Sequence, residues 1–269
     1  MSAITVSAVE YLNARPLVHG LDARSDLFSL RFDVPAKCAS LLQEKSVDLG
    51  LIPSIECLRH QSDYRIVPEI AVASMGPVAS VALFTDRPPT SLRSIAVDAG
   101  SRTSTALLRV LCAKWFDIEP TFVTLRPDLP VMLKRCDAAL LIGDEALYQD
   151  HEAIGLDKID LGEEWLAMTG LPFVWAVWAG REHAVTAEHL QALTAARDAG
   201  VGALDEIADR FAAARDDDDG ESIARAREYL HENVFYTLDE QGRAGLKKFF
   251  TLASDIEVVP SAGPLRFFE

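Results

Sequence analysis

The sequence has few cysteines and no cysteine pair of the kind that binds zinc or exchanges disulfides. Its four cysteines are widely spaced among 269 residues and form no CxxC motif. This spacing excludes a zinc ribbon and a thioredoxin-type site. In a cytosolic protein we expect such thiols to be free and mostly buried. They are Cys38, Cys57, Cys112 and Cys136.

Metal and dinucleotide motifs are also missing. The six histidines are scattered without metal-ligand spacing, so we predict no metal site. Gly200-Val201-Gly202 follows no predicted strand, which argues against a dinucleotide-binding loop. We therefore expect the protein to work without a cofactor.

Positive charge is scarce. The chain has 26 Lys and Arg residues against 41 Asp and Glu residues, which gives a formal net charge of −15. Nucleic acids and anionic membrane surfaces need a basic footprint, so neither is an expected partner. An anionic small molecule would need a locally positive site, which helix N-termini or a few arginines can supply.

Long apolar runs are absent as well. The longest, at residues 171–179, is too short to span a bilayer and contains Pro172. The first residues, MSAITVSAVE, lack a basic start and do not resemble a signal peptide. We therefore expect a cytoplasmic protein without a membrane partner.

The sequence does contain a regular alternation of strands and helices. Short β-branched runs alternate with helical patterns, which predicts a mainly parallel sheet with helices on both faces. The expected strands are 4–9, 28–34, 47–52, 66–73, 78–85, 94–97, 121–125 and 138–142, and the expected helices are 15–21, 36–45, 103–115 and 129–135. From Thr186 to Ser254 the chain is almost wholly helical and charged. The acidic run at 216–219 is expected to be a solvated loop.

Two interruptions divide this pattern. Residues 86–90 break it after the first set of strands, and residues 170–172 break it before the last strand. Two crossings imply two lobes, one formed by residues 1–85 and 176–269 and the other by residues 86–175. The predicted fold class is therefore α/β with two lobes that close on a ligand and a helical C-terminal extension packed on lobe one.

The end of the first strand carries the most informative residues. Tyr11 and Asn13 follow the strand directly, and Pro16 can open a helix because its missing N–H costs nothing in the first turn. Ligands of open α/β sheets bind beyond the carboxyl ends of strands, so Asn13 is placed to face a cleft. Capping of the helix by Asn13 explains the same pattern, and the sequence leaves both interpretations open.

A helix start rich in hydroxyl groups predicts an anion site in the second lobe. Gly100 permits an unusual turn after the strand, and the following hydroxyl and backbone N–H groups suit a carboxylate. Ordinary capping by Ser and Thr is the alternative. The segment contains Ser101, Arg102, Thr103, Ser104 and Thr105.

Five segments between residue 4 and about residue 180 carry a family resemblance. They are Tyr11-Leu12-Asn13 with Pro16-Leu17, residues 47–54, Gly76-Pro77-Val78 with Ser80-Val81, Asp137-Ala138-Ala139-Leu140 with Ile142-Gly143-Asp144, and Thr169-Gly170-Leu171-Pro172-Phe173. Together they resemble the menaquinone-biosynthesis dehydratases of the futalosine route.

This resemblance implies the fold of type II periplasmic solute-binding proteins, without secretion. It also implies chorismate dehydratase activity, a hydro-lyase reaction that converts chorismate to 3-((1-carboxyvinyl)oxy)benzoate and water. The functional Asn of the family corresponds to Asn13, and its functional Ser corresponds to Ser80, with Ser74 as a rival. Lys37-Cys38 stands where relatives are expected to be rich in Ser.

The implied reaction aromatises a cyclohexadiene and is strongly downhill, so the enzyme needs mainly orientation and a proton acceptor. On this hypothesis Asn13 hydrogen-bonds the substrate where the proton or the hydroxyl is lost, and Ser80 orients the enolpyruvyl group. Asp144 and the substrate's own carboxylate are candidate bases, and helix capping is another role for Asp144. The predicted contacts to the carboxylate substrate are Tyr11, Arg15, Ser54, Ser74, Gly76, Ser101, Arg102, Thr103, Ser104, Thr105, Asp144, Thr169 and Gly170.

Three other functions fit the same sequence. A non-catalytic binding protein for a small organic anion would have the same lobes. The later dihydroxynaphthoate-forming lyase of the same pathway shares the fold. A sensory effector domain is a third alternative, although no helix-turn-helix segment precedes Ile4. The oligomeric state does not follow from the sequence.

Overall fold

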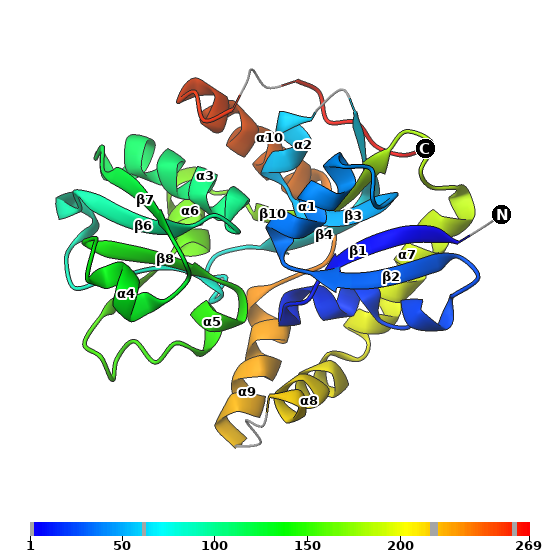
Figure 1. The fold of residues 1–269 in the computed structure, drawn as a ribbon, viewed down its shortest axis with the longest axis horizontal. Helices are drawn as coiled ribbons and strands as arrows, with labels where there is room; N and C mark the ends of the chain where they lie inside the picture. Colours follow the sequence, from blue (N-terminus) through cyan, green and yellow to red (C-terminus); the bar gives the residue numbers. More distant parts are fainter. Residues whose placement is uncertain (1–2, 61–62, 216–219, 260–262) are drawn as a thin grey trace.

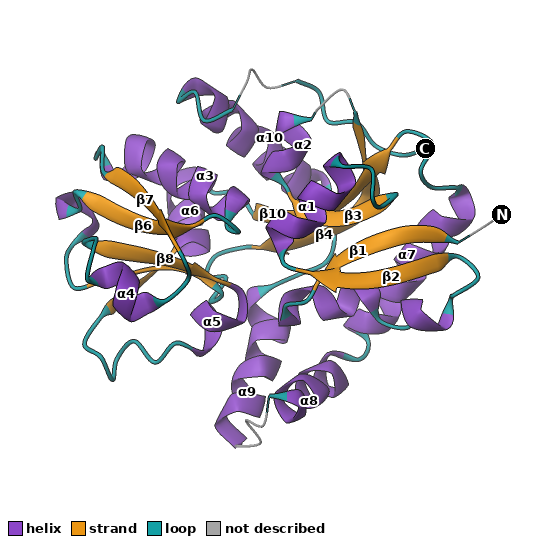
Figure 2. Cartoon of the chain, viewed as in Figure 1, coloured by secondary structure: helices purple, strands orange, loops and turns teal. Residues whose placement is uncertain are grey.

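The chain builds two five-stranded sheets that lie next to each other (Figures 1 and 2). The structure is a computed structural model, and it describes residues 3–60, 63–215, 220–259 and 263–269. The acidic run at 216–219, expected to be a solvated loop, lies outside these residues. Among the described residues, none of the helices combines the length and apolar composition that a bilayer crossing requires.

The first sheet has the strand order β2-β1-β3-β10-β4. Strand β1 is parallel to both of its neighbours, and β10 is antiparallel to β3 and β4. Every residue of β3 is buried, as expected for a central strand that packs on both faces. The strands are β1 (Ile4–Val9), β2 (Phe28–Asp33), β3 (Leu49–Pro53), β4 (Tyr64–Ser74) and β10 (Phe173–Arg181).

The second sheet has the order β7-β6-β8-β5-β9. Strand β6 is parallel to β7 and β8, whereas β5 is antiparallel to β8 and β9. The strands are β5 (Val81–Thr85), β6 (Ser94–Asp98), β7 (Thr121–Leu125), β8 (Ala138–Ile142) and β9 (Asp157–Asp160).

Helices and short helical turns connect the strands. Before β10 they are η1 (Leu12–Val18), η2 (Leu21–Ala23), α1 (Pro35–Gln43), α2 (Ile55–Arg59), η3 (Pro89–Ser91), α3 (Arg102–Leu111), η4 (Cys112–Phe116), α4 (Leu129–Leu133), α5 (Gly143–Tyr148) and α6 (Leu161–Thr169). After it they are α7 (Ala187–Val201), α8 (Leu204–Ala214), α9 (Gly220–Glu228), η5 (Tyr229–Asn233) and α10 (Glu240–Asp255).

The sheet pairing corrects the expected position of the two crossings. Strand β5 lies within residues 1–85, assigned to lobe one, but it pairs with β8 and β9 in the second sheet. The start of β10, assigned to lobe two, pairs with β4 in the first sheet. The chain therefore crosses at residues 75–80 and 170–172. An apolar run shows that a strand is buried but not which sheet buries it.

Of the C-terminal helices, α7 packs against η1 and β4, α10 packs against β10 and also contacts α3 of the second lobe, and α8 and α9 lie below the first sheet in this view (Figure 1). Helix α7 lies against η1 so closely that a Cβ on Gly200 would be 2.0 Å from the carbonyl oxygen of Pro16. Gly200 therefore lies inside α7, where this helix touches η1. It is not part of a loop that follows a strand. The fold places the first residues after β1 between the sheet and the C-terminal helices.

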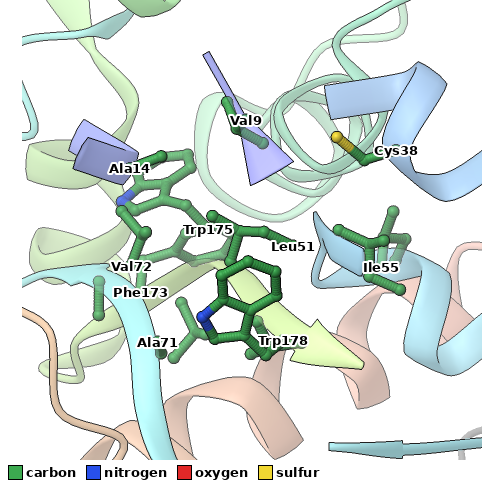
Figure 3. Packing of buried hydrophobic residues seen from close by; sticks show 14 of the residues in the cluster. Val9, Ala14, Cys38, Leu51, Ile55, Ala71, Val72, Phe173, Trp175 and Trp178 are labelled. Atoms are coloured by element: carbon green, nitrogen blue, oxygen red, sulfur yellow. The ribbon is translucent and has the colours of Figure 1, made fainter. Parts of the chain in front are cut away.

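The core contains large aromatic residues on β10. Figure 3 shows Phe173, Trp175 and Trp178 from this strand among apolar residues of the neighbouring strands. Trp178 is fully buried, whereas Trp175 also reaches the wall of a cavity. All four cysteines are buried and free, as expected. Burial raises the pKa of the Cys38 thiol to about 11, so this thiol stays protonated near neutral pH.

Candidate functional site

A cavity of about 70 Å³ lies between the two sheets, at the carboxyl ends of strands β1, β3, β6 and β8. It adjoins a wider opening of about 680 Å³, because Tyr11, Gly100, Arg102 and Ile142 line both. Most of its walls are apolar, which strengthens the few polar contacts inside it. Its lining residues are Val9, Tyr11, Asn13, Ala14, Pro35, Leu51, Pro53, Val72, Val81, Gly100, Ser101, Arg102, Thr103, Ser104, Ile142, Gly143, Trp175 and Ala176.

Asn13 reaches this cavity from the first turn of η1. Its neighbours Leu12 and Ala14 are buried, so the turn is anchored on both sides of it. The N-terminus of η1 is capped from the second sheet, where Asp144 Oδ1 accepts a hydrogen bond of 3.1 Å from the Leu12 N–H. The Asn13 side chain does not have to supply this cap, and Asn13 lines the cavity.

Ser80 has a buried tyrosine as its partner, Tyr229, which no sequence motif indicated. Its hydroxyl lies 2.7 Å from Ser80 Oγ. This pair thus joins the first crossing to the C-terminal helical segment. Ser80 is buried and does not line the cavity itself.

The crossing that carries Ser80 is held by one buried carboxylate. Asp160 Oδ1 accepts hydrogen bonds from the Val78 and Gly162 N–H groups at 3.0 and 2.8 Å, and Oδ2 accepts one from Ala79 at 2.6 Å. Burial raises the pKa of Asp160, and these hydrogen bonds oppose that shift. Ala79 has a φ of 60°, a left-handed conformation that needs such support.

Ser74, the rival of Ser80, has a different partner. Its hydroxyl accepts a hydrogen bond of 3.0 Å from Trp175 Nε1, so it orients an aromatic wall of the cavity. Gly76 has a φ of 106°, which a side chain rarely adopts, and it serves the turn rather than the cavity wall. Of the two serines, Ser74 is therefore bonded to a wall residue of the cavity, and Ser80 is bonded to the buried Tyr229.

The hydroxyl-rich start of α3 faces the cavity as expected. Ser101, Thr103 and Ser104 are buried and line it. Ser101 stands at the helix N-cap without forming a side-chain cap, so ordinary capping does not explain this hydroxyl. In the part of the chain that the structure describes, Ser101 Oγ, Thr105 Oγ1 and Ser54 Oγ are buried without a hydrogen-bond partner. Unpartnered donors beside a helix N-terminus suit a carboxylate.

Contacts across the cleft come from the same helix. Thr103 Oγ1 accepts a hydrogen bond of 3.2 Å from the Ile55 N–H. Arg102 pairs with the buried carboxylate of Glu56 at 3.1 Å and donates to Ser40 Oγ at 3.0 Å. Arg102 therefore lines the cavity while two of its nitrogens bind lobe-one groups, which lowers its net positive charge toward a ligand.

Arg15 does not reach the cavity, which corrects its selection as a substrate contact. Its guanidinium lies 5.2 Å from the ring centre of Phe32 and lines a separate surface pocket. The turn is a 3₁₀ helix, in which residues two apart point in different directions. Asn13 and Arg15 therefore face different surroundings.

Thr169 and Gly170 are also outside the cavity lining. Thr169 Oγ1 donates to the Trp165 carbonyl oxygen at 2.8 Å, and Gly170 ends α6 with a φ of 69°. Both residues terminate a helix, which accounts for their motif without a ligand. Ser54 lies next to the cavity at the start of α2, where its N–H donates to the Trp175 carbonyl oxygen at 3.0 Å.

Asp144 and Gly143 form the second-sheet side of the opening. A Cβ on Gly143 would be 2.7 Å from the Tyr11 ring, and its φ is 65°, so glycine allows Tyr11 to pack here. Burial raises the pKa of Asp144 to about 6. A carboxyl group with a perturbed pKa at a cleft is typical of functional sites. It caps η1 rather than its own helix.

The raised pKa of Asp144 predicts a pH-dependent stability effect. Below pH 3.8 Asp144 is mostly protonated in both the folded and the unfolded chain. As the pH rises from there to about 6, the carboxyl group ionises first in the unfolded chain, so the free energy of unfolding falls. An asparagine side chain in its place would stay neutral and keep an oxygen for the Leu12 N–H. We expect Asp144→Asn to match the wild type near pH 4 and to be roughly 1–3 kcal/mol more stable at pH 7.5. Urea unfolding at both pH values measures the difference, and a pH-independent gap would contradict it.

Comparison with known proteins shows the family of the chain. A family model described as menaquinone biosynthesis matches residues 4–255. The chain belongs to this menaquinone-biosynthesis family. It is 34% identical over 256 residues to a chorismate dehydratase of Thermus thermophilus, and the match covers 89% of this chain and 91% of that protein.

Solved structures show the fold of this menaquinone-biosynthesis family member. The alkanesulfonate-binding protein SsuA of Xanthomonas axonopodis pv. citri matches with a TM-score of 0.71 at 17% identity, over 97% of this chain and 95% of that one. The Candida albicans CA3427 gene product, which has the generic periplasmic binding protein fold, matches with a TM-score of 0.69 at 13% identity, over 100% and 98%. The predicted periplasmic-binding-protein-like fold is confirmed.

Proposed function

We propose that the protein is a chorismate dehydratase, a carbon–oxygen lyase that removes water from chorismate to form 3-((1-carboxyvinyl)oxy)benzoate for menaquinone biosynthesis. The match to the chorismate dehydratase of Thermus thermophilus, across 89% of the chain, carries the proposal. The cavity between the sheets supports it, because Asn13 and the hydroxyl groups of α3 reach the same mostly apolar space.

The binding half of the proposal assigns a substrate carboxylate to the start of α3. Ser101 Oγ and the N–H groups of the first helical turn would donate to it, aided by the positive end of the helix dipole. These contacts would make the site locally positive in a chain whose net charge is −15. The ring would then lie between the apolar walls provided by Trp175 and Leu51.

The chemical half assigns the reacting centre to Asn13. Its amide would hydrogen-bond the substrate where the hydroxyl leaves, and aromatisation supplies the driving force. An amide does not take a proton as a base, so a carboxylate must do so. The substrate's enolpyruvyl carboxylate and Asp144 are the two candidates, and Asp144 is already engaged with the Leu12 N–H.

The test is to incubate the protein with chorismate and follow the ultraviolet spectrum for an aromatic product, with mass spectrometry to show the loss of one water. We expect many turnovers per protein molecule. Stabilisation of the protein by chorismate without conversion would instead identify a binding protein of the same fold. Formation of a dihydroxynaphthoate from a later intermediate would identify the later lyase. We also propose the cytoplasm as the location of the protein.

A further inference from the structure

Tyr11 lies at the junction between the inner cavity, of about 70 Å³, and the outer opening, of about 680 Å³. The residues that line both spaces are Tyr11, Gly100, Arg102 and Ile142. The last three belong to the lobe of the second sheet, so among these described residues Tyr11 is the contribution of the first lobe. Its ring is therefore placed to separate the two spaces.

The ring packs on a backbone seat in the second lobe. A Cβ on Gly143 would lie 2.7, 2.8 and 2.9 Å from Cε2, Cδ2 and Cζ of Tyr11, so only glycine lets the ring come this close. The seat is fixed, because the Gly143 N–H donates to the Ser80 carbonyl oxygen at 2.8 Å. Next to it, the hydrogen bond from the Leu12 N–H to Asp144 joins the same two segments. The two lobes therefore meet here through a ring and a residue without a side chain.

The inner cavity is too small for the proposed substrate while the ring is seated. Pockets that hold small organic ligands usually measure about 300–1,000 Å³. The inner cavity and the outer opening together reach this range once the group between them moves. Arg102 is held in place by an ion pair with Glu56 and a hydrogen bond to Ser40. The Tyr11 ring meets Gly143 through van der Waals contact, so it is the easier of the two to displace.

We propose that Tyr11 is a gate residue, whose ring leaves the Gly143 seat to admit the substrate and returns to seal the inner cavity from water. Exclusion of water strengthens the polar contacts that Asn13 and the start of α3 make inside the cavity. The effect of the gate on turnover rests on the proposed function. The seal itself can be measured without a substrate.

Tryptophan fluorescence reports this seal. Trp175 lines the inner cavity and is 7% exposed, Trp115 is 44% exposed, and the other two tryptophans are fully buried. Replacing Trp115 by Phe therefore removes the exposed fluorophore. In this Trp115→Phe background we expect Tyr11→Ala and Gly143→Ala each to raise the acrylamide quenching constant by about twofold or more, because the quencher gains access to Trp175. Unchanged quenching in Tyr11→Ala would overturn the gate.

The chain offers a matched control for the glycine substitution. Gly155 has a φ of 69°, close to the 65° of Gly143, so alanine meets the same backbone strain at both positions. A Cβ on Gly155, however, has no described atom within 4 Å. Gly155→Ala should therefore leave both the quenching constant and chorismate turnover within about threefold of the wild type.

A kinetic double-mutant cycle links the ring to its seat. We expect Gly143→Ala to lower kcat/KM for chorismate roughly 10- to 100-fold, because its Cβ displaces the ring. In a Tyr11→Ala background the same substitution should cost less than about threefold, since no ring is left to displace. Equal fold losses in both backgrounds would assign the effect to backbone strain and contradict the gate. Absence of chorismate conversion by the wild type would count against the proposed function, while the quenching result still decides the gate.

Discussion

Asn13→Ala is expected to lower chorismate turnover by roughly 10²–10³-fold, the usual effect of removing one hydrogen-bonding group at a reacting centre. The side chain lines a mostly apolar cavity, where a hydrogen bond to a developing charge is strong. The fold should persist, because Asn13 is only half-buried and Asp144, not Asn13, caps its turn. Steady-state kinetics with chorismate, together with circular dichroism of the variant, measures both expectations.

Asn233→Ala is the matched control for this substitution. Asn233 also forms a side-chain hydrogen bond, donating to the Pro77 carbonyl oxygen at 3.0 Å, but it lies outside the cavity lining. We expect its replacement to change turnover by less than about threefold, since it removes no contact with the reacting centre. Turnover by Asn13→Ala close to that of Asn233→Ala would exclude Asn13 from the mechanism.

Asp160→Ala is expected to destabilise the protein by roughly 3–5 kcal/mol and to lower turnover as well. The carboxylate accepts hydrogen bonds from the backbone of both the Ser80 crossing and the start of α6. Its removal leaves the Val78 and Gly162 N–H groups buried without an acceptor. Equilibrium urea unfolding gives the stability change, and kinetics on the folded fraction gives the effect on turnover.

Two comparisons separate this role from that of an ordinary helix cap. Asp128 is an exposed N-cap that accepts one hydrogen bond, from the Val131 N–H at 3.0 Å, so Asp128→Ala should cost only about 1 kcal/mol. Asp160→Asn keeps one oxygen but places an amide nitrogen against one of the donors, so it should fall between Asp160→Ala and the wild type. Equal stability losses in Asp160→Ala and Asp128→Ala would refute the predicted role of Asp160.

Local sequence signals located the cavity side chains that follow strand ends. Asn13 follows β1, and Ser101, Thr103 and Ser104 follow β6. Each position depends on a short pattern of apolar strand, turn residue and helix start, which the chain specifies within a few residues. Arg15 was selected by the same proximity and lies elsewhere, because residues two apart on a helical turn point to different faces.

Contacts between distant segments gave no comparable signal. Tyr229 lies in a helical, charged tail that reads as packing or surface, and it meets Ser80 across 149 residues. Asp160 meets Val78 across 82 residues. Neither pair shares a motif, and a buried polar side chain is recognisable only when its partners are known.

By itself, the sequence determined the α/β class, the strand ends that bear Asn13 and the hydroxyl-rich helix start, because strand and helix periodicity and turn chemistry act over short stretches of chain. The tertiary structure alone decided that β5 joins the second sheet, that Asp160 supports the Ser80 turn and that Tyr229 pairs with Ser80. These outcomes depend on which buried groups find hydrogen-bond partners after packing. Such partners are chosen by the position of whole elements in space, which no local pattern encodes.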